Sequence, residues 1–332
     1  MRNIFFFMFL LFLYKSNAQK VVMLHKANGQ QVAFYGNQPL HDAYAVANNE
    51  DTIYLPGGVF EMPNMGKRLT IYGAGHYPDS TIATSKTIIA NPFFIGSDAD
   101  SLHLEGIEFI GHITVGSDVN YLVFKRNVLQ SIGFNNLPIS SNCRIEGSVV
   151  KDYISTTYAS NFLLVNNIIG GQLSSTKNGD VVRNNIFLMT DNNYPLNSCY
   201  YTLFENNIFL CTLPNGLIYG GGNYNTFSNN VFSITPTWSL NTVNFNYVNT
   251  VFSNLFVSQT GNQFSYSHNY HLQTPASFIG ADGTQCGIYG GVFGYKEGAV
   301  PLNPHIRQKN ISNATDVNGK LNVNITVGAQ NN

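Results

Sequence analysis

The sequence predicts an all-β protein, a single-stranded right-handed parallel β-helix made of stacked coils. The first observation is a repeat, in which Val181-Val-Arg-Asn-Asn-Ile-Phe-Leu188 returns as Leu203-Phe-Glu-Asn-Asn-Ile-Phe-Leu210 and as Thr226-Phe-Ser-Asn-Asn-Val-Phe-Ser233. The second is its period of about 21 residues, which is typical of a solenoid. The third is the content of the unit, where β-branched and aromatic residues flank the Asn pairs. That combination favours strands and turns over helices.

The aliphatic residue after each Asn pair, here called the register residue, fixes the alignment of the copies. Its positions in chain order are Ile107, Val128, Val149, Ile168, Ile186, Ile208, Val231 and Leu255. Each unit is too short to bury an apolar face alone, so it must stack on its neighbours. Ile53, Ile71 and Ile88 continue the series towards the N-terminus, which predicts about eleven coils along roughly 50 Å of axis.

A strand is expected on each side of the Asn pair, because most units carry an apolar residue four positions before the register residue. These residues are Phe124, Ile145, Leu164, Val182, Phe204, Phe227 and Val251. Asn tolerates the left-handed backbone that a sharp turn requires. Stacked coils would also align side chains of one kind. The sequence therefore predicts a ladder of side-chain amides through Asn167, Asn185, Asn207, Asn230 and Asn254. It also predicts a stack of aromatic rings through Phe187, Phe209 and Phe232.

Several short strands per coil with an Asn-marked turn resemble the right-handed parallel β-helix of the pectin lyase-like superfamily. The resemblance covers roughly residues 40–290. The later run Asp282-Gly-Thr-Gln-Cys-Gly-Ile-Tyr-Gly-Gly291 looks like the end of other secreted bacterial β-helix proteins, whose function is not established. The resemblance implies the fold, and a fold that hosts many activities does not specify one.

One domain, residues 19–332, is expected after a signal peptide over residues 1–18. The first 18 residues contain the charged Arg2, an apolar run of ten residues and the small-residue cleavage site Ser16-Asn-Ala18. This is the pattern of a secretory signal, and the run is too short for a stable membrane span. The chain is therefore expected to be exported, to the periplasm, the cell surface or the medium. No Cys lies near the cleavage site, so no lipid anchor is expected.

A capping helix is expected at the start of the domain, over residues 40–50. Leu40, Ala43, Tyr44 and Ala47 recur at helical spacing, and a solenoid needs a cap on its open end. Coils are then expected over residues 51–280.

A turn-rich closing segment is expected over residues 281–332. Within it, residues 321–327 alternate apolar and polar side chains. This alternation predicts a half-exposed strand, packed along the side or the end of the solenoid.

The low charge limits the possible partners. Seventeen basic and eighteen acidic residues give a net charge of −1, and charged residues make up 11% of the chain, against about 25% in ordinary globular chains. This balance argues against nucleic acid or an anionic membrane as the main partner. No cofactor or metal is expected, because the chain has no such motif and His268 and His271, three residues apart, would face opposite ways on a strand.

Four cysteines are present, at Cys143, Cys199, Cys211 and Cys286. None has the C-x-x-C spacing of a zinc site. They are expected to be buried free thiols, with disulfides as the alternative in an exported chain.

Charged residues that could carry catalysis lie in the first half of the chain. Residues 206–281 contain no Asp, Glu, Lys or Arg, whereas glycoside hydrolases need clustered carboxylates and the lyases of the superfamily use acidic calcium ligands and a base. Asp152, Lys151 and Arg144 form the best remaining acid–base candidate. Glu105 and Glu108, three residues apart, should face opposite sides of a strand.

Two further pairs of charges have a structural interpretation. Lys125 precedes Glu146 by one coil, and Arg183 precedes Glu205 by one coil. Stacking would make each an opposite-charge pair between neighbouring coils.

Aromatic residues of the second half are the candidate ligand-binding groups. They lie in or near the longer loops, at Tyr194, Tyr200, Tyr201, Tyr219, Tyr224, Trp238 and Tyr247. Tyr and Trp rings can lie against sugar rings while amides bond sugar hydroxyls. Trp238, Tyr219, Tyr224 and Tyr247 are the predicted contacts, and packing of the loops onto the solenoid is the alternative.

The function expected from these features is non-catalytic binding of an extracellular polysaccharide or another surface. Two hypotheses from other classes stay open. One is a polysaccharide lyase or glycoside hydrolase that uses the charged coils. The other is a structural protein of a surface assembly, since an exposed uncharged face can also join copies of the chain.

Overall fold

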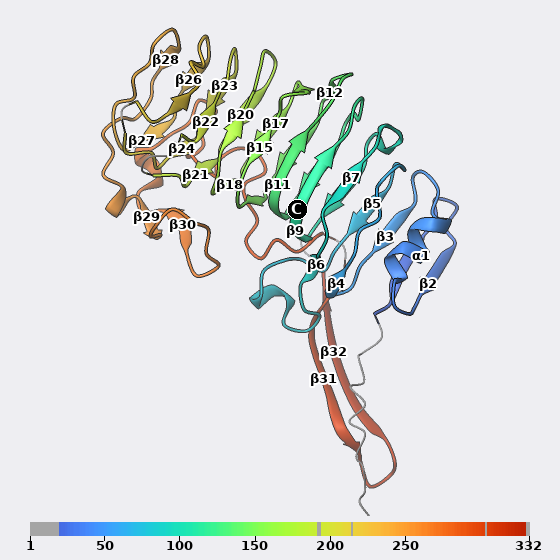
Figure 1. Cartoon of the computed structure of the whole chain (residues 1–332). Helices are drawn as coiled ribbons and strands as arrows, with labels where there is room; N and C mark the ends of the chain where they lie inside the picture. The colour runs from blue at the N-terminus through green and yellow to red at the C-terminus, as the bar shows by residue number, and fades with distance from the viewer. Residues whose placement is uncertain (1–19, 191–193, 214, 303, 330–332) are drawn as a thin grey trace, which may run out of the picture.

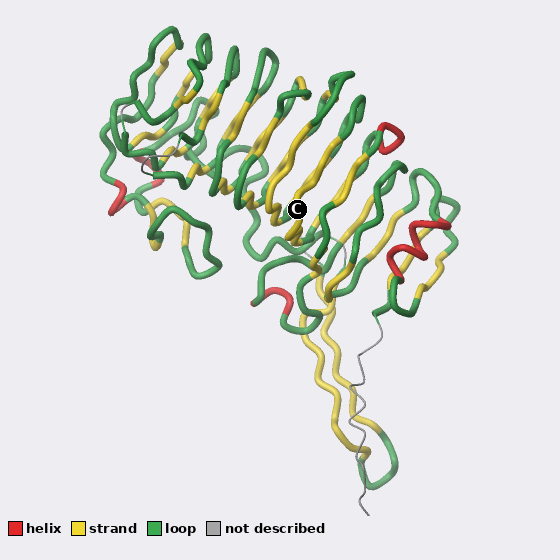
Figure 2. The backbone as a smooth tube through the Cα atoms, in the orientation of Figure 1, coloured by secondary structure: helices red, strands yellow, loops and turns green. Residues whose placement is uncertain are grey.

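The computed structural model describes residues 20–190, 194–213, 215–302 and 304–329, and it is a parallel β-solenoid of about nine turns (Figure 1). Short strands recur at the same place in successive coils and are joined by loops (Figure 2). Two sheets run along the solenoid. The first has 12 strands, in the order β2 (Gln31–Phe34), β1 (Val22–His25), β3 (Thr52–Tyr54), β5 (Thr70–Tyr72), β8 (His103–Glu105), β10 (Val123–Lys125), β13 (Arg144–Glu146), β17 (Leu163–Val165), β20 (Val181–Arg183), β23 (Leu203–Glu205), β26 (Thr226–Ser228) and β28 (Thr242–Asn244).

The second sheet has 14 strands and follows the first in each coil. Its members are β4 (Gly58–Phe60), β6 (Thr87–Ile89), β7 (Phe93–Ile95), β9 (Glu108–Val115), β11 (Val128–Phe134), β14 (Val149–Val150), β15 (Ile154–Ser155), β18 (Ile168–Ile169), β19 (Leu173–Ser174), β21 (Ile186–Phe187), β22 (Leu196–Asn197), β24 (Ile208–Phe209), β25 (Ile218–Tyr219) and β27 (Val231–Phe232). Three two-stranded sheets complete the strands: β12 (Ser140–Ser141) with β16 (Ala159–Ser160), β29 (Phe256–Ser258) with β30 (Asn269–Leu272), and β31 (His305–Thr315) with β32 (Leu321–Gly328).

Each strand of the first sheet from β3 onwards is three residues long, and its middle residue pairs with the equivalent residue of the next coil. The paired series is Ile53, Ile71, Leu104, Phe124, Ile145, Leu164, Val182, Phe204, Phe227 and Val243. All but Val243 are fully buried. The predicted apolar series is thus confirmed from Phe124 to Phe227, and Val243 takes the place predicted for Val251.

The coil count of about nine corrects the expected eleven. Ile53 and Ile71 belong to the first sheet, whereas Ile88 belongs to the second. Strand β5 pairs directly with β8, so residues 70–103 form one long coil and not two. The register residue of the next coil is Glu108, which pairs with Ile88 and with Val128, and not the predicted Ile107.

The last copy of the repeat also differs from the prediction. Tyr247, and not Leu255, forms the bridge to Val231. Asn246, and not Asn254, follows Asn230 in the amide ladder. The final coil is short, because only sixteen residues separate these two amides. Leu255 instead lies beyond the coils, directly after the 3-10 turn η3 (Phe252–Asn254).

The amide ladder itself is confirmed over its other members. Asn167 donates from Nδ2 to Oδ1 of Asn185 over 3.0 Å, Asn185 donates to Asn207 over 2.9 Å, and Asn207 donates to Asn230 over 3.0 Å. Each Oδ1 also accepts the backbone N–H of the preceding coil's Asn. Buried amides that satisfy each other in this way tie one coil to the next without leaving an unpaired polar group.

The core of the solenoid is filled by aligned side chains from both sheets. Phe187 stacks on Phe209 with ring centroids 4.6 Å apart, and Phe209 stacks on Phe232 at 5.1 Å. This confirms the predicted ring stack. All four cysteines are buried free thiols, as the sequence predicts.

At the N-terminal end, α1 (Pro39–Val46) closes the core, as predicted. Leu40 and Ala43 are buried against the same core cluster as Val22 and Leu24 of β1. The helix is shorter than the expected 40–50, because Ala47 already has an extended backbone with ψ of 146°.

The register residues point away from the core, which the sequence did not predict. Val128, Ile186 and Ile208 form a second apolar cluster on the outer wall, together with Ile288 and Tyr295 from the closing segment. Residues 279–301, here called the strap, run back along this wall from the last coil towards the first (Figure 1). The 3-10 turn η4 (Pro275–Ser277) precedes the strap; two others are η1 (Asp79–Thr81) and η2 (Ser97–Ala99).

The hairpin of β31 and β32 projects from the solenoid (Figure 1). Residues 321–327 pair with β31 alone among the described strands, and every one of them is exposed. The expectation that this strand packs along the solenoid is therefore wrong. Its alternation instead gives the hairpin one apolar and one polar face. Among the residues described, no helix is long and apolar enough to cross a membrane.

Candidate functional site

The three residues of the predicted acid–base cluster are not brought together by an ion pair among the described contacts. Lys151 reaches Glu108, with Nζ 2.9 Å from Oε1. Arg144 lies on the first sheet, with Nε 3.9 Å from Oε2 of Glu146. Asp152 is exposed beside β15, on the second-sheet side. Each cation thus faces a carboxylate other than Asp152.

Glu108 is a buried carboxylate that contacts two lysines. Lys86 and Lys151 both lie 2.9 Å from its oxygens. Burial alone would raise the pKa of Glu108, but the hydrogen bonds from these two lysines outweigh it and lower the pKa. A carboxylate held ionised in this way is a poor proton donor at neutral pH.

The two predicted charge pairs between coils are confirmed. Lys125 Nζ lies 2.8 Å from Oε1 of Glu146, and Arg183 Nε lies 2.9 Å from Oε2 of Glu205. The four residues hold the outer surface of the first sheet together, and a partly exposed pair of this kind is worth at most about 1 kcal/mol.

Trp238 and Tyr247, two of the predicted ligand contacts, have packing roles. The Trp238 ring lies against Phe227 and Phe232, with centroids 5.6 and 5.4 Å away, and so covers the C-terminal end of the core. The Tyr247 hydroxyl accepts the N–H of Ile279 over 3.0 Å and donates to its C=O over 2.9 Å. Tyr247 therefore anchors the start of the strap.

Tyr224 lies on a different surface, at the corner where each coil enters the first sheet. Its ring stacks on that of Tyr201 from the preceding coil, with centroids 5.1 Å apart and planes at 14°. Both rings remain more than half exposed, at 56% for Tyr201 and 52% for Tyr224. Leu240, two residues before the next strand, is exposed at the same corner. We call Tyr201, Tyr224 and Leu240 the tyrosine ridge.

The backbone at this corner is left-handed. Tyr201 and Tyr224 have φ of 53° and 62°. Coils without a tyrosine here use Asn142, Asn161 and Gly179, also at positive φ. Asn and Gly adopt this conformation at low cost, whereas a bulky residue does not. The corner folds without an aromatic side chain, so the two exposed rings serve something other than the turn.

A neutral hollow of about 170 Å³ adjoins the ridge. Its lining includes Asn223, which precedes Tyr224, and Ile218, which precedes Tyr219. Asn, Thr and Ser side chains provide its polar groups. The exposed ring of Tyr219 packs against Tyr194 with centroids 5.0 Å apart. The described lining of the hollow thus includes chain neighbours of Tyr219 and Tyr224 and carries no charged side chain.

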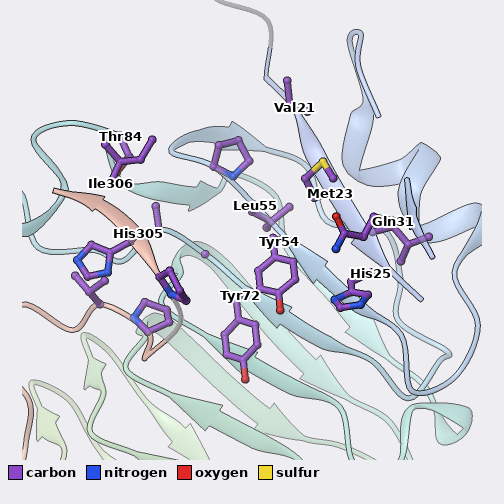
Figure 3. Close-up of a pocket in the computed structure, with 17 residues that line it drawn as sticks. Val21, Met23, His25, Gln31, Tyr54, Leu55, Tyr72, Thr84, His305 and Ile306 are labelled. Atoms are coloured by element: carbon purple, nitrogen blue, oxygen red, sulfur yellow. The ribbon is translucent and has the colours of Figure 1, made fainter. Parts of the chain in front are cut away.

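A further hollow, of about 720 Å³, lies at the N-terminal end and was not predicted from the sequence. Figure 3 shows the rings of Tyr54 and Tyr72 side by side in it, with both hydroxyls pointing the same way. The ring centroids are 5.6 Å apart. Apolar residues such as Met23 and Leu55 form much of its wall. A signal was present in the sequence, because Thr-Ile-Tyr occurs at residues 52–54 and again at 70–72.

No group of three or more His, Cys, Asp or Glu residues in the described part of the chain is placed to hold a metal. His268 contacts the Tyr270 hydroxyl, at 3.1 Å from Nδ1, and the His271 ring stacks on Tyr289. Comparison of the chain with known protein families, with curated proteins and with solved structures found no match in any of the three.

Proposed function

We propose that the protein is an exported, non-catalytic β-solenoid that binds neutral polysaccharide at the tyrosine ridge. The observation that carries this proposal is the pair Tyr201 and Tyr224, stacked and more than half exposed at a left-handed corner that does not itself require an aromatic side chain. Residues that hold an unfavourable backbone conformation are often functional. Assignment to the pectin lyase-like superfamily is part of the proposal and rests on the repeat pattern.

The chemistry of the surface supports a neutral sugar ligand. Sugar rings have apolar faces that pack on aromatic rings, and both rings of the stacked tyrosine pair are more than half exposed. The neighbouring hollow offers amides and hydroxyls from residues such as Asn215, Asn223 and Thr237. Residues 206–281 contain no Asp, Glu, Lys or Arg, so nothing charged there competes for a neutral ligand.

The test is a panel of soluble and insoluble polysaccharides, with bound protein and newly formed sugar ends measured in the same samples. Binding without new ends is expected. Tyr224→Asn should weaken binding about tenfold, an effect of about 1.4 kcal/mol, while the melting temperature stays unchanged, because Asn suits the corner.

The matched control is Tyr121→Asn, which changes a tyrosine that is equally exposed, at 58%, and also at positive φ, at the same corner of a distant coil. It should leave binding unchanged. Equal loss in both variants, or no binding to any polysaccharide, would contradict the proposal. New sugar ends that Asp152→Ala abolishes would establish the lyase or hydrolase hypothesis instead. Absence of both signals would favour a structural role in a surface assembly.

A further inference from the structure

A basic hollow lies between the strap and the solenoid wall. Its volume is about 410 Å³, within the range of small-molecule pockets, roughly 300–1,000 Å³. One wall is the coil surface of the first sheet and the other is the strap between residues 291 and 296. The lining residues that matter here are Lys125, Arg126, Glu146, Phe293, Tyr295 and Lys296.

Arg126 occupies a position that neighbouring coils fill differently. It lies at the corner between the two sheets with φ of 53°. The equivalent residues of later coils, such as Asn166 and Asn206, hold the same left-handed backbone and bond the strap. The coils on either side of Arg126 have Gly106 and Gly147 at this corner. Arginine rarely adopts a left-handed backbone, whereas Asn and Gly adopt it at a lower conformational energy.

The two flanking glycines make room around Arg126. Gly147 itself lines the hollow. A side chain at Gly106 would meet Pro301, since a Cβ there would lie 2.5 Å from the proline ring. The strap is bonded to the coils up to Gly290, whose C=O accepts a hydrogen bond from Asn166 Nδ2 over 2.8 Å. Further along, Tyr295 is again buried against the wall, whereas Val292 and Phe293 between these two points are exposed. Arg126 and Phe293 both line the hollow.

Cations outnumber carboxylates around the hollow. Its described lining contains the three cations Lys125, Arg126 and Lys296 and the one carboxylate Glu146. Lys125 pairs with Glu146, and Arg126 pairs with Glu105 outside the lining. Arg126 and Lys296 line the same hollow. Burial lowers the pKa of Lys296, and the charge of Arg126 lowers it further, while Glu105 raises it. Positive groups that crowd in a hollow favour an anion that relieves their repulsion.

The rim of the same hollow is apolar and exposed. Val292 and Phe293 are 89% and 73% exposed, although large apolar side chains are usually buried. A charged floor beneath an apolar rim suits a ligand that combines both properties.

We propose that this basic hollow binds a small organic anion. Its carboxylate, sulfate or phosphate group lies by Arg126 and Lys296, and its apolar body lies against Phe293. The site is separate from the tyrosine ridge, so either proposal can fail without the other.

Calorimetric titration of the full chain at fixed ionic strength tests this proposal. The probes are phenyl phosphate, phenyl sulfate and benzoate. Inorganic phosphate is the control that carries the anionic group without an apolar body, and benzyl alcohol is the control that carries the apolar body without a charge. At least one aromatic anion should bind at least tenfold more tightly than inorganic phosphate, and benzyl alcohol should not bind. Raising the salt concentration should weaken binding, and the ranking of the three anions identifies the anionic group.

Three variants locate the site. Arg126→Asn introduces the residue that later coils have at this corner and should lower the affinity at least tenfold. Phe293→Ser should weaken phenyl phosphate but not inorganic phosphate, and it provides the test if Arg126→Asn does not fold. Arg183→Asn, which removes an arginine from the same sheet outside the hollow, is the matched control. No binding by any aromatic anion, or equal binding by wild type and both hollow variants, would overturn the proposal.

Discussion

Asn206 and Asn207 are neighbours in the chain, and their side chains hold different parts of the molecule. Asn207 points inward, where its Nδ2 donates to Val182 C=O over 2.8 Å and to Asn230 Oδ1 over 3.0 Å. Asn206 points outward, where its Oδ1 accepts the N–H of Ala281 in the strap over 2.8 Å. One residue of each Asn pair thus joins the coils and the other makes the turn and, in several coils, anchors the strap.

Replacement of the inward amide should be costly. Asn207→Ala removes the acceptor of the buried Asn185 N–H, one of the three acceptors of Asn185 Nδ2, and the amide that donates to Val182 C=O. Buried groups left unpaired cost about 1–3 kcal/mol each, so the free energy of unfolding in urea should fall by about 3 kcal/mol. Asn322→Ala, on the exposed hairpin, is the control and should change it little. A loss below about 1 kcal/mol would show that the ladder is not what joins the coils.

Replacement of the outward amide should act on the strap alone. Asn206→Gly keeps the left-handed backbone, where φ is 58°, and loses the bond to Ala281. Global stability should fall by only about 1 kcal/mol, while limited proteolysis within residues 279–301 becomes faster. Unchanged cleavage would mean that the apolar cluster beneath the strap holds it without this bond.

Trp238→Ala should destabilise the last coils. The indole ring covers Phe227 and Phe232, and its removal leaves part of the core open to water. We expect a loss of about 2–3 kcal/mol, somewhat below the value for a fully buried aromatic residue, with faster hydrogen exchange at β26 to β28. Tyr224→Asn, which changes an exposed ring, should not show this effect. Equal stability of Trp238→Ala and wild type would contradict the packing role.

Acid should destabilise the fold through His76. Burial lowers the pKa of His76 to about 3, from an ordinary value of 6.5. Between these values the unfolded chain binds a proton that the folded chain does not, so stability is lost as the pH falls from 6.5 towards 3. The loss reaches about 3 kcal/mol at pH 4. His76→Phe should flatten the fall in unfolding free energy between pH 7 and pH 4, and an unchanged slope would contradict this assignment.

Asp180 should act in the opposite direction. Burial raises the pKa of Asp180 to about 6 from its ordinary value of 3.8, although the N–H groups of Phe162 and Lys177 oppose the shift. As the pH falls, Asp180 is therefore protonated at a higher pH in the folded chain than in the unfolded chain. Its protonation adds to the free energy of unfolding below pH 6, and this contribution is lost as the pH rises through 6. Asp180→Asn should make acid destabilisation steeper in the same urea titrations, and a shallower slope would refute this sign.

The projecting hairpin should be dispensable for folding. Its strand β32 is exposed along residues 321–327 and pairs with β31 alone among the described strands. A chain that ends at Pro304 should keep the melting temperature of wild type within a few degrees. Because an uncovered apolar strand face promotes association, light scattering at high concentration should also decrease. A large loss of stability would show that the hairpin supports the first coils.

The repeat determined what recurs from coil to coil. Asn207 and Phe209 meet their counterparts one coil away, so a spacing near 21 residues is enough to predict the amide ladder and the ring stack. Tyr219 and Tyr224 could be selected as aromatic residues outside the Asn-pair repeat, and the structure shows both of them exposed. Tyr219 lies on β25 and Tyr224 lies at the recurring corner before β26, and not in irregular loops. The true coil count was missed because Ile71 and Ile88 look equivalent in sequence and lie on different sheets.

Only the tertiary structure decided the contacts that do not repeat. It placed the strap over the register residues, such as Ile186, which the pattern alone cannot assign to the inside or the outside of the wall. It also brought Arg126 and Lys296 together across 170 residues of chain. The physical reason is that stacking contacts join equivalent positions of neighbouring units, whereas the path of the strap depends on where the whole wall leaves apolar surface and unpaired amides.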